Sequence, residues 1–498
     1  MTDRSRASEP TGPESRGTEP TGPVSSGSTP TTAEDRTPSP PLPTDIWVLV
    51  SAAFIVAIGF GIIAPILPQF AASFDLGVTA ASIVVSSFAF FRLVFAPMGG
   101  RLVDKLGERR VYVVGLLIVA ASTYAVAAAT TYWQLLLFRG LGGIGSTMFT
   151  VSAMALIIRM APPKARGKAT GAYASSFLFG NILGPVVGGM LAGLGMRIPF
   201  VIYATGLLLA AAVVWFRLER KPQLDRPVAE PADDEPADDG PADDGPAPEV
   251  GETSAVTGTS GREAASTPAD RETEAEPAGG QTEAAPVSRE IAGMPRMRFR
   301  DAWQDSAYRA SLGSGIAVGW AAMGARIALY PLFVVAVLGA DERVAGIALT
   351  VFAAGMAVSV AVAGRLTDSW GRRPFILVGL ALLGTATIAV GFSSTVWVFF
   401  ALTLIAGLGG GLVNPSVQAT VGDVIGNDRR GGTVLSRFQM SIDVGAIAGP
   451  VVSGMLVDAF GYDWAFLVTG LVVLVALAIW LRGRETLPSR QEASPTRR

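Results

Sequence analysis

Four charged side chains stand inside long apolar stretches of this sequence, where they are the residues best placed to do chemistry. They are Arg92, Arg139, Arg326 and Asp443. A charge at the centre of an apolar helix costs about 2.5–3.5 kcal/mol on the insertion scale, so a functional role is the default interpretation. Burial disfavours the charged form of a carboxylate and a facing arginine favours it, so Asp443 is a candidate for gaining and losing a proton. A permanent salt bridge between Asp443 and one of the arginines accounts for the same pattern, and both interpretations stay open.

Other reactive groups are scarce. The chain has 498 residues with no cysteine and no histidine, which removes thiol nucleophiles, disulfides and imidazole bases. Nothing in it resembles a nucleotide-binding loop, a metal-ligand cluster or a nucleophile beside its base. We therefore expect that the protein is not an enzyme, that it uses no cofactor or metal, and that it does not bind nucleic acid.

The four charges must be positioned by membrane-spanning helices. Half of the residues are hydrophobic and only 16% are charged, which is typical of a membrane protein. Apolar stretches long enough to cross a bilayer occur in two sets of six. The expected spans are Ile46–Phe70, Ala80–Val103, Val111–Ala129, Trp133–Ile158, Ala169–Leu194, Pro199–Leu218, Ala310–Leu338, Val344–Thr367, Pro374–Phe392, Val396–Ile425, Thr433–Phe460 and Trp464–Leu481.

Polar segments flank and separate the two sets. Residues 1–45 are rich in Pro, Ser, Thr and Gly and are expected to form a disordered N-terminal tail. Residues 219–308 contain Pro-Ala-Asp-Asp repeats and are expected to form a disordered acidic linker. This organisation gives a first six-helix bundle at 46–218, a second at 309–482 and a short C-terminal tail at 483–498.

Lysine and arginine gather in alternate short loops, which predicts the orientation in the membrane. Lys105 and Arg110 follow the second span and Arg373 follows the eighth, whereas the loops at 130–132 and 393–395 carry no Lys or Arg. Short basic loops stay in the cytoplasm. We therefore expect a multi-pass protein of the inner cell membrane, with both tails and the acidic linker on the cytoplasmic side.

The two sets of spans carry the same motifs in the same order. The run Gly100–Arg110 at the end of the second span is repeated as Gly364–Arg373 at the end of the eighth. The run Gly180–Gly189 in the fifth span is repeated as Gly445–Gly454 in the eleventh. Such a repeat predicts two bundles of the same topology, with a substrate site at their interface near the bilayer midplane.

With these motifs the sequence resembles the major facilitator superfamily of transporters, and within it the twelve-span branch of drug:proton antiporters. The resemblance covers about the whole membrane region. It implies an all-α integral membrane fold, in which two six-helix bundles are related by a pseudo-twofold axis. It also implies that Arg139, whose counterpart in the second bundle is Ala406, takes part in proton coupling. A structural ion pair or a backbone contact of Arg139 is the alternative.

The repeated loop run resembles the family's signature between the second and third spans, and it suggests a conformational latch. Its glycines allow a tight turn and close helix approach. Its carboxylate can cap the next helix and pair with arginines in one conformation only, so that breaking these contacts biases the conformational equilibrium. A plain turn in a basic loop is the alternative. The latch candidates are Gly100, Asp104, Gly107, Arg109, Arg110, Gly364, Asp368, Gly371, Arg372 and Arg373.

Glycines in the fifth span recur every four residues, so they share one helix face and permit close packing against a neighbour. The run also contains a proline, which removes one backbone hydrogen bond. It resembles the motif of drug:proton antiporters, which implies a seam that seals the two halves against proton leak. The motif residues in both halves are Gly180, Gly184, Pro185, Gly188, Gly189, Gly445, Gly449 and Pro450.

Aromatic and amide side chains inside the spans are candidates for lining a cavity, because apolar walls with few polar contacts suit amphipathic substrates. Each of them alone is as well explained by packing or lipid contact. The candidates are Phe88, Phe91, Tyr173, Asn181, Trp320, Tyr330, Asn414, Gln418 and Gln439.

These features predict a secondary active transporter that works by alternating access, and the resemblance implies that it exports small amphipathic compounds in exchange for protons. Its expected partners are a small-molecule substrate, the lipid bilayer and protons, and the chain is expected to act as a monomer. An uptake permease or metabolite exporter of the same fold is the first alternative. A membrane sensor or scaffold that does not transport is the second.

Overall fold

A computed structural model describes residues 42–162, 165–218, 295, 297–426, 429 and 431–487 of the chain. The expected N-terminal tail, most of the acidic linker and the last residues of the C-terminal tail lie outside the described residues. The linker ends earlier than the sequence suggested, because Phe299–Gln304 forms helix α9 and α10 begins at Ser306. The carboxylate of Asp305 caps this junction by accepting a hydrogen bond from the backbone N–H of Ala307.

The described residues contain twelve helical segments that are long and apolar enough to cross a membrane, as expected. The first half of the chain holds α1 (Thr44–Ile63), α2 (Leu67–Ala72), α3 (Gly77–Leu106), α4 (Glu108–Ala128), α5 (Tyr132–Met160), α6 (Arg166–Ala192) and α7 (Ile198–Arg217). The second half holds α9, α10 (Ser306–Val318), η2 (Gly319–Ala325), α11 (Arg326–Ala336), α12 (Glu342–Trp370), α13 (Arg373–Gly391), α14 (Val396–Ile425), α15 (Gly432–Phe460) and α16 (Tyr462–Trp480).

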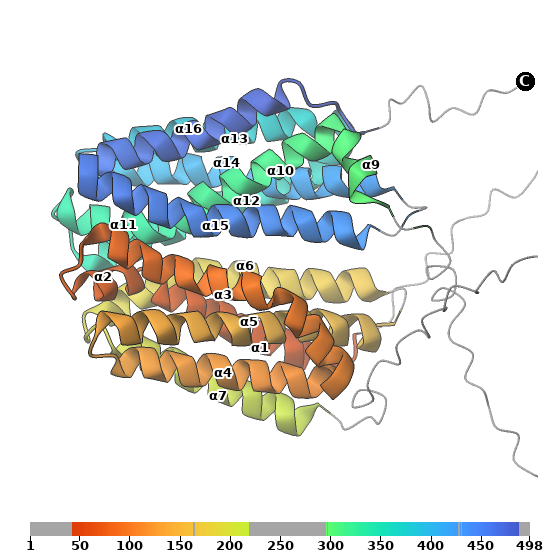
Figure 1. Ribbon diagram of the computed structural model, residues 1–498, viewed down its shortest axis with the longest axis horizontal. Coiled ribbons are helices and arrows are strands. Elements are labelled where there is room, and N and C mark those ends of the chain that lie inside the picture. Colours follow the sequence, from red (N-terminus) through yellow and green to blue (C-terminus); the bar gives the residue numbers. More distant parts are fainter. Residues whose placement is uncertain are drawn as a thin grey trace, which may run out of the picture. The chain divides into compact units, whose positions relative to one another are not determined.

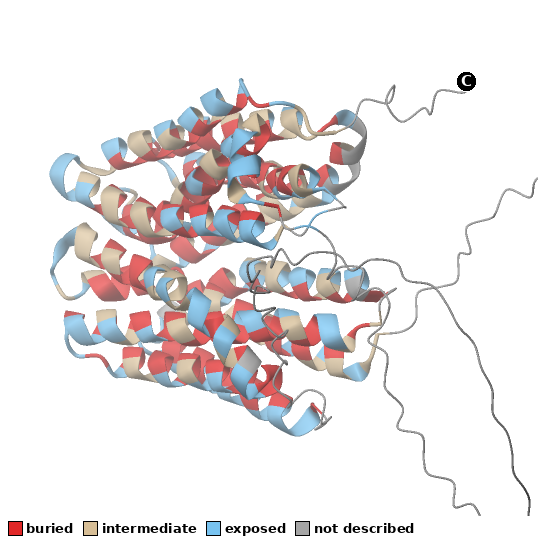
Figure 2. Ribbon diagram, turned by 45° about the vertical axis from the view of Figure 1, so that its right-hand side comes forward, coloured by how far each residue is buried: buried red, intermediate tan, exposed pale blue. Residues whose placement is uncertain are grey.

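The two halves pack their helices in the same way, which confirms the predicted all-α fold of two six-helix bundles (Figure 1). In the first, α5 contacts α3 and α4, α4 contacts α7, and α1 contacts α6. In the second, α14 contacts α12 and α13, α13 contacts α16, and the α10–η2 segment contacts α15. Buried residues run through the interior of each bundle (Figure 2).

Repeated end signals explain why equivalent helices begin and end at equivalent places. The side chains of Thr131 and Thr395 accept hydrogen bonds from the first turns of α5 and α14. Gly107 and Gly371 end α3 and α12 with φ of 83° and 96°, a conformation that residues with a Cβ rarely adopt. The turn role expected for these two glycines of the loop signature is therefore present in both halves.

The bundles meet mainly through two helix pairs, α3 with α15 and α6 with α12, and α11 makes smaller contacts with α2 and α3. We call the end that carries the loops of Lys105, Arg110 and Arg373 the basic end, and the opposite end the far end. Contacts between the bundles lie toward the far end, where a Cβ on Gly189 would meet Gly346 at 3.3 Å. There too, a Cβ on Gly454 would meet the Ser82 side chain at 2.7 Å.

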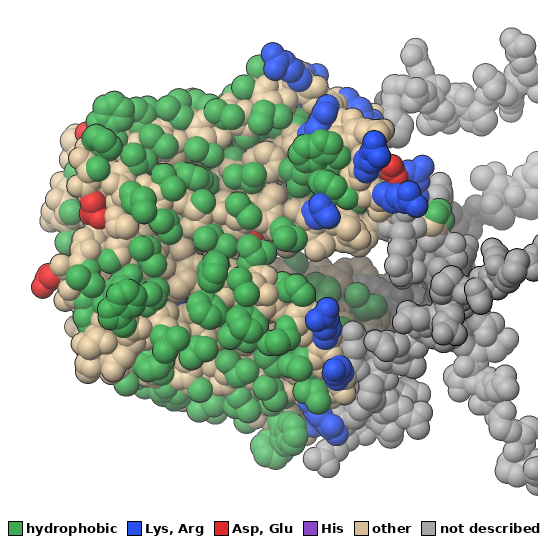
Figure 3. Space-filling model, in the orientation of Figure 1, with side chains coloured by type: hydrophobic (Ala, Val, Ile, Leu, Met, Phe, Trp, Pro, Cys, Tyr) green, Lys and Arg blue, Asp and Glu red, His purple; other side chains and the backbone are tan. Residues whose placement is uncertain are grey.

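Toward the basic end the same helices separate. A Cβ added at Gly100, Gly167, Gly171 or Gly432 would meet nothing within 4 Å. Figure 3 shows a hollow between the two bundles on the side where Lys and Arg side chains gather. The structure is therefore open between the bundles at the basic end and closed at the far end.

Candidate functional site

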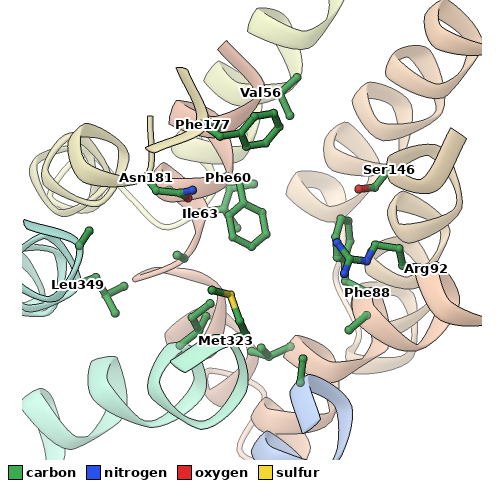
Figure 4. A pocket seen from close by; sticks show the side chains of 18 of the residues that line it. Val56, Phe60, Ile63, Phe88, Arg92, Ser146, Phe177, Asn181, Met323 and Leu349 are labelled. Carbon is green, nitrogen blue, oxygen red and sulfur yellow. The ribbon is translucent and has the colours of Figure 1, made fainter. Parts of the chain in front are cut away.

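A cavity of about 580 Å³ lies between the two bundles, within the range of volumes that bind small molecules. Its walls come from both halves, including α1, α3, α5 and α6 of the first and η2, α12, α14 and α15 of the second. Most of the lining is apolar, as Figure 4 shows for Phe60, Ile63, Met323 and Leu349. Such a surface suits a ligand with a sizeable apolar part.

All four charged residues singled out in the sequence line this cavity. Arg92 on α3 and Asp443 on α15 form an ion pair in which the guanidinium Nη2 donates to the carboxylate Oδ1. The Arg92 side chain is 37% exposed and that of Asp443 is 10% exposed. Since α3 belongs to the first bundle and α15 to the second, the pair ties the two bundles together.

The position of Arg92 is set from its own bundle. The Thr147 hydroxyl on α5 donates to the Arg92 carbonyl oxygen at 3.0 Å and to the Gly143 carbonyl oxygen at 3.2 Å. A Cβ at Gly143 would come within 2.3 Å of the Phe88 carbonyl oxygen, so glycine is needed where α5 crosses α3. This close crossing fixes the position of α3, and with it Arg92, relative to α5.

The other two arginines are stacked on aromatic rings at equivalent places in the two halves. The Arg139 guanidinium carbon lies 4.2 Å from the ring centroid of Phe88, and that of Arg326 lies 4.0 Å from Phe352. Phe88 and Phe352 precede Arg92 and its counterpart Met356 by the same four residues. Each bundle thus presents one guanidinium against one phenylalanine on the cavity wall.

A π-helical segment, η2, immediately precedes Arg326 in the middle of its span. Its glycines let the backbone approach α15 closely, because a Cβ at Gly319 would lie 2.0 Å from the Ile442 carbonyl oxygen. π-Helical turns occur mostly at functional sites. Arg326 and Met323 both lie on the cavity wall, as does Asp443 of α15.

The expected cavity residues divide into two groups. Phe88, Tyr173, Asn181, Asn414 and Gln439 line the cavity. The other four candidates do not line the cavity. Phe91 stacks on Phe95, and the Trp320 indole N–H donates to the Thr469 hydroxyl at 3.4 Å. Tyr330 packs on Phe399 and Phe466, and Gln418 is exposed.

The residues of the repeated loop signature are held within their own bundles. Arg109 donates to the Trp215 carbonyl oxygen at 2.5 Å and stacks on its ring at 5.0 Å. Arg110 is exposed on the first turn of α4. The side chains of Asp104 and Asp368, like Gly364, lie outside the part of the structure that is described, so the latch stays a prediction.

In the second half the signature residues bind the segment after α16. Arg372 pairs with Asp423 through an Nε–Oδ2 contact of 2.7 Å. The backbone N–H groups of Arg372 and Arg373 both donate to the Glu485 carboxylate at 2.9 Å. Glu485, more than 100 residues later in the chain, therefore caps the N-terminus of α13.

Most glycines of the motif pack helices within each bundle, whereas Gly189 and the Pro185 carbonyl face Gly346 of the other bundle, so the seal between the halves stays a prediction. A Cβ on Gly180, Gly184 or Gly188 would come within 2.3–2.5 Å of α1 atoms of the same bundle. Gly445 and Gly449 face α10 and η2 in the same way. The reason is the four-residue spacing, which turns these glycines to one side of the helix and leaves Gly189 on the side that faces α12. Pro185 and Pro450 stand against Gly61 and Gly324.

Sequence reasoning missed three residues of this arrangement. Phe60 projects into the cavity from α1, Phe352 carries Arg326, and Asp458 joins the bundles at the far end. The repeat offered a signal for Phe352, because it occupies the place of Phe88. No comparable signal marked the other two. In the sequence Phe60 is one of many apolar residues of the first span, and Asp458 is a polar residue near the end of the eleventh.

Comparison with known proteins gives a consistent family assignment. The sequence profile of the Major Facilitator Superfamily matches residues 49–323 and 312–497. Multidrug resistance protein 1 of Bacillus subtilis (strain 168) is 32% identical over 176 residues, 35% of this chain and 45% of that protein. Quinolone resistance protein NorA of Staphylococcus aureus is 32% identical over 165 residues, 33% of this chain and 42% of that protein. The matched stretches thus span less than half of each relative.

Among solved structures, the fold is similar to that of a bacterial homologue of the human lysosomal transporter Spinster. That structure, inward-facing and unoccupied, aligns with a TM-score of 0.64 and 16% sequence identity. The alignment covers 88% of this chain and 95% of the other. At this level of identity the similarity shows a shared fold.

Proposed function

Since the chain belongs to the Major Facilitator Superfamily, we propose that it is a secondary active transporter that exports small amphipathic compounds in exchange for protons. The observation that carries the proposal is the Arg92–Asp443 ion pair, which joins the two bundles at the wall of the interfacial cavity. A pair in this place links a titratable group, a ligand space and the relative position of the bundles. The multidrug and quinolone resistance proteins to which the chain is similar support export as the direction.

Alternating access requires that the bundles open in turn at each end. In the present conformation the far end is closed by bonds between bundles. The Asp458 carboxylate accepts from the backbone N–H groups of Val78 and Thr79 at 2.9 and 2.8 Å. The Thr350 hydroxyl donates to the Ile182 carbonyl oxygen at 3.2 Å. Opening the far end breaks these bonds, and the latch at the basic end would then form in exchange.

Proton coupling is assigned to Asp443. Protonation removes the carboxylate charge, so the bond from Arg92 loses its ionic component and the tie between the bundles weakens. Loss of the proton restores the tie. Arg139 lies in the same cavity and adds a second guanidinium group of the first bundle to its wall.

The orientation follows from the basic loops. Short loops rich in Lys and Arg remain in the cytoplasm, so the open basic end faces the cytoplasm and the chain termini lie there too. An exporter open toward the cytoplasm is in the state that loads substrate. In this proposal a single chain forms the complete cavity and acts as a monomer in the cell membrane.

An uptake permease or metabolite exporter is the first alternative, and a non-transporting sensor the second. Everted membrane vesicles with an acidic lumen separate the three. An exporter driven by proton influx accumulates an amphipathic probe in the lumen, and collapsing the pH gradient with an ionophore releases the probe. An uptake permease accumulates its substrate in right-side-out vesicles instead. No movement of any amphipathic probe in either vesicle defeats transport altogether.

A further inference from the structure

The charges on the cavity wall do not balance. Among the described residues that line it, three are arginines, Arg92, Arg139 and Arg326, and one is acidic, Asp443. Asp443 is paired with Arg92. The lining therefore carries two guanidinium groups in excess, and arginine keeps its charge in proteins.

Arg139 has no acidic partner among the described residues. It is 9% exposed, and its Nε atom is buried without a hydrogen-bond partner. Its neighbours are the rings of Phe88 and Phe60, with centroids 4.2 and 6.0 Å from the guanidinium carbon. The stacking offsets part of the cost of burying the charge but leaves the hydrogen-bonding capacity of the guanidinium unused.

Arg326 is in the same situation in the other bundle. Its Nε donates to the Ala322 carbonyl oxygen at 2.9 Å, and its guanidinium lies over Phe352. That carbonyl bond is local to the π-helical turn and fixes the direction of the side chain. The remaining nitrogens carry donors for which the described residues provide no acidic acceptor. An unneutralised cation on each wall is an arrangement that an anion completes.

We propose that the substrate is an amphipathic anion carrying a carboxylate, bound between Arg139 and Arg326 with its apolar part against Phe60, Met323 and Leu349. The inference rests on the proposed function and names its substrate class. A carboxylate matches the planar fork of a guanidinium through two parallel hydrogen bonds. The apolar body suits the surrounding lining, and an amphipathic cation is repelled by the excess positive charge.

The proposed exchange is consistent with this charge. A carboxylate leaving a cell with a negative interior moves down the electrical gradient, and a proton entering the cell also moves down it. Both movements are therefore favoured by the same membrane potential. The two functions fall on different residues. The Asp443 carboxylate binds the proton, and the guanidinium groups of Arg139 and Arg326 bind the substrate.

The test is binding of a matched series of ligands to the purified full-length protein, without any gradient. The series 4-butylbenzoate, 4-butylbenzyl alcohol and 4-butylbenzylamine shares one apolar body and differs in charge. Isothermal titration should show the benzoate binding at least about tenfold more tightly than the alcohol, and the amine most weakly. Arg139→Gln and Arg326→Gln should each weaken benzoate binding about tenfold and leave alcohol binding unchanged, which also reports that the variants are folded.

Arg309→Gln is the matched control, because it removes one arginine charge from an exposed position outside the cavity lining. Arg139→Lys keeps the charge without the planar fork and should bind the benzoate with intermediate affinity. Amine binding as tight as benzoate binding, or benzoate affinity unchanged in both Gln variants, overturns the inference. Benzoate binding without gradient-driven transport leaves the carboxylate-binding site standing and defeats the proposed function.

Discussion

Arg92 on α3 and Asp443 on α15 form an ion pair between the two bundles, and the same two helices are joined again at the far end through Thr79 and Asp458. The two levels are separated by about 20 Å along the helices, given a rise of about 1.5 Å per residue. The contact at the cavity depends on the Asp443 carboxylate. The contact at the far end depends on the Asp458 carboxylate, which caps the N-terminus of α3. A proton on Asp443 would therefore weaken one tie while the other still holds the far end closed.

Replacing Asp443 with asparagine should uncouple transport from the pH gradient. The variant keeps the side-chain shape but has no group to protonate, so gradient-driven accumulation in everted vesicles should fall at least about tenfold. Substrate exchange without a gradient should persist. Asp341→Asn, which removes an exposed carboxylate at the far end, is the control and should transport normally. Full gradient-driven accumulation by Asp443→Asn would remove Asp443 from the coupling mechanism.

Asp458→Asn should shift the conformational equilibrium toward opening at the far end. The carboxylate accepts two backbone N–H groups and the Thr79 hydroxyl, and hydrogen bonds to a charged acceptor contribute about 1.5–3 kcal/mol when buried. Because Asp458 is exposed, we expect a smaller shift of about 1.4 kcal/mol at most, or up to about tenfold in population. The negative carboxylate also interacts favourably with the positive end of the α3 dipole, and a neutral asparagine amide loses this interaction.

The absence of cysteine allows this shift to be measured directly. Spin labels on Thr130→Cys and Ser394→Cys, two exposed loop positions at the far end of opposite bundles, report the separation there. The population with the longer distance should increase in Asp458→Asn and stay constant in Asp463→Asn. An unchanged distance distribution in Asp458→Asn would show that Asp458 does not close the far end.

A methyl group on Gly188 should disrupt the packing of α6 on α1. Its Cβ would lie 2.3 Å from the Ile62 carbonyl oxygen, a backbone atom that cannot move alone. Overpacking of this kind costs about 1–3 kcal/mol, so Gly188→Ala should lower the melting temperature of the purified protein. Gly171→Ala on the same helix meets nothing within 4 Å and is the control. Equal melting temperatures for the two variants would contradict the close packing.

This glycine seam shows what the sequence could and could not predict. The spacing of Gly180, Gly184 and Gly188 indicated one tight helix face, the apolar stretches predicted the spans, and the repeat predicted the two bundles. Which neighbour that face would contact depends on the rotation of the helix in the bundle. A four-residue period does not fix that rotation, so the structure was needed to show that the neighbour is α1.

The candidate site was partly predictable for the same reason. Charges inside apolar spans are costly wherever they point, so Arg92, Arg139, Arg326 and Asp443 were identified from residue type alone. Aromatic residues carry no such cost on the lipid side or in a core, so Tyr330 and Phe88 were indistinguishable. The pairing of Arg92, rather than Arg139 or Arg326, with Asp443 depends on the crossing of α3 and α15, which required the structure.

Acid should weaken the attachment of the segment after α16. Burial alone would raise the pKa of Glu485, but the hydrogen bonds from Arg372, Leu487, Arg373 and Thr486 outweigh it and lower the pKa below the ordinary value of 4.5. For Asp305, burial is likewise outweighed by the bond from Arg484, and its pKa also lies below the ordinary value. A lowered pKa contributes stability above the unfolded-state value, and this contribution is lost as the pH falls through the folded-state value.

We therefore expect the melting temperature of the purified protein to fall between about pH 5 and about pH 3. Glu485→Gln should remove about 1 kcal/mol at pH 7, the usual contribution of a helix cap, and flatten part of the acid response. Asp301→Asn, which changes an exposed carboxylate on α9, should leave the curve unchanged. An acid response identical in Glu485→Gln and the wild type would show that the cap does not stabilise the fold.

The most direct test of proton-coupled export is the direction of proton movement when a substrate gradient alone is imposed. The purified protein is reconstituted in liposomes with a trapped pH dye, equal pH on both sides and 4-butylbenzoate on one side only. The account predicts that protons move opposite to the substrate in the wild type, and that Asp443→Asn moves none. Once the proton flux carried by the neutral acid in protein-free liposomes is subtracted, protons moving in the same direction as the substrate, or unchanged proton movement in Asp443→Asn, would contradict it.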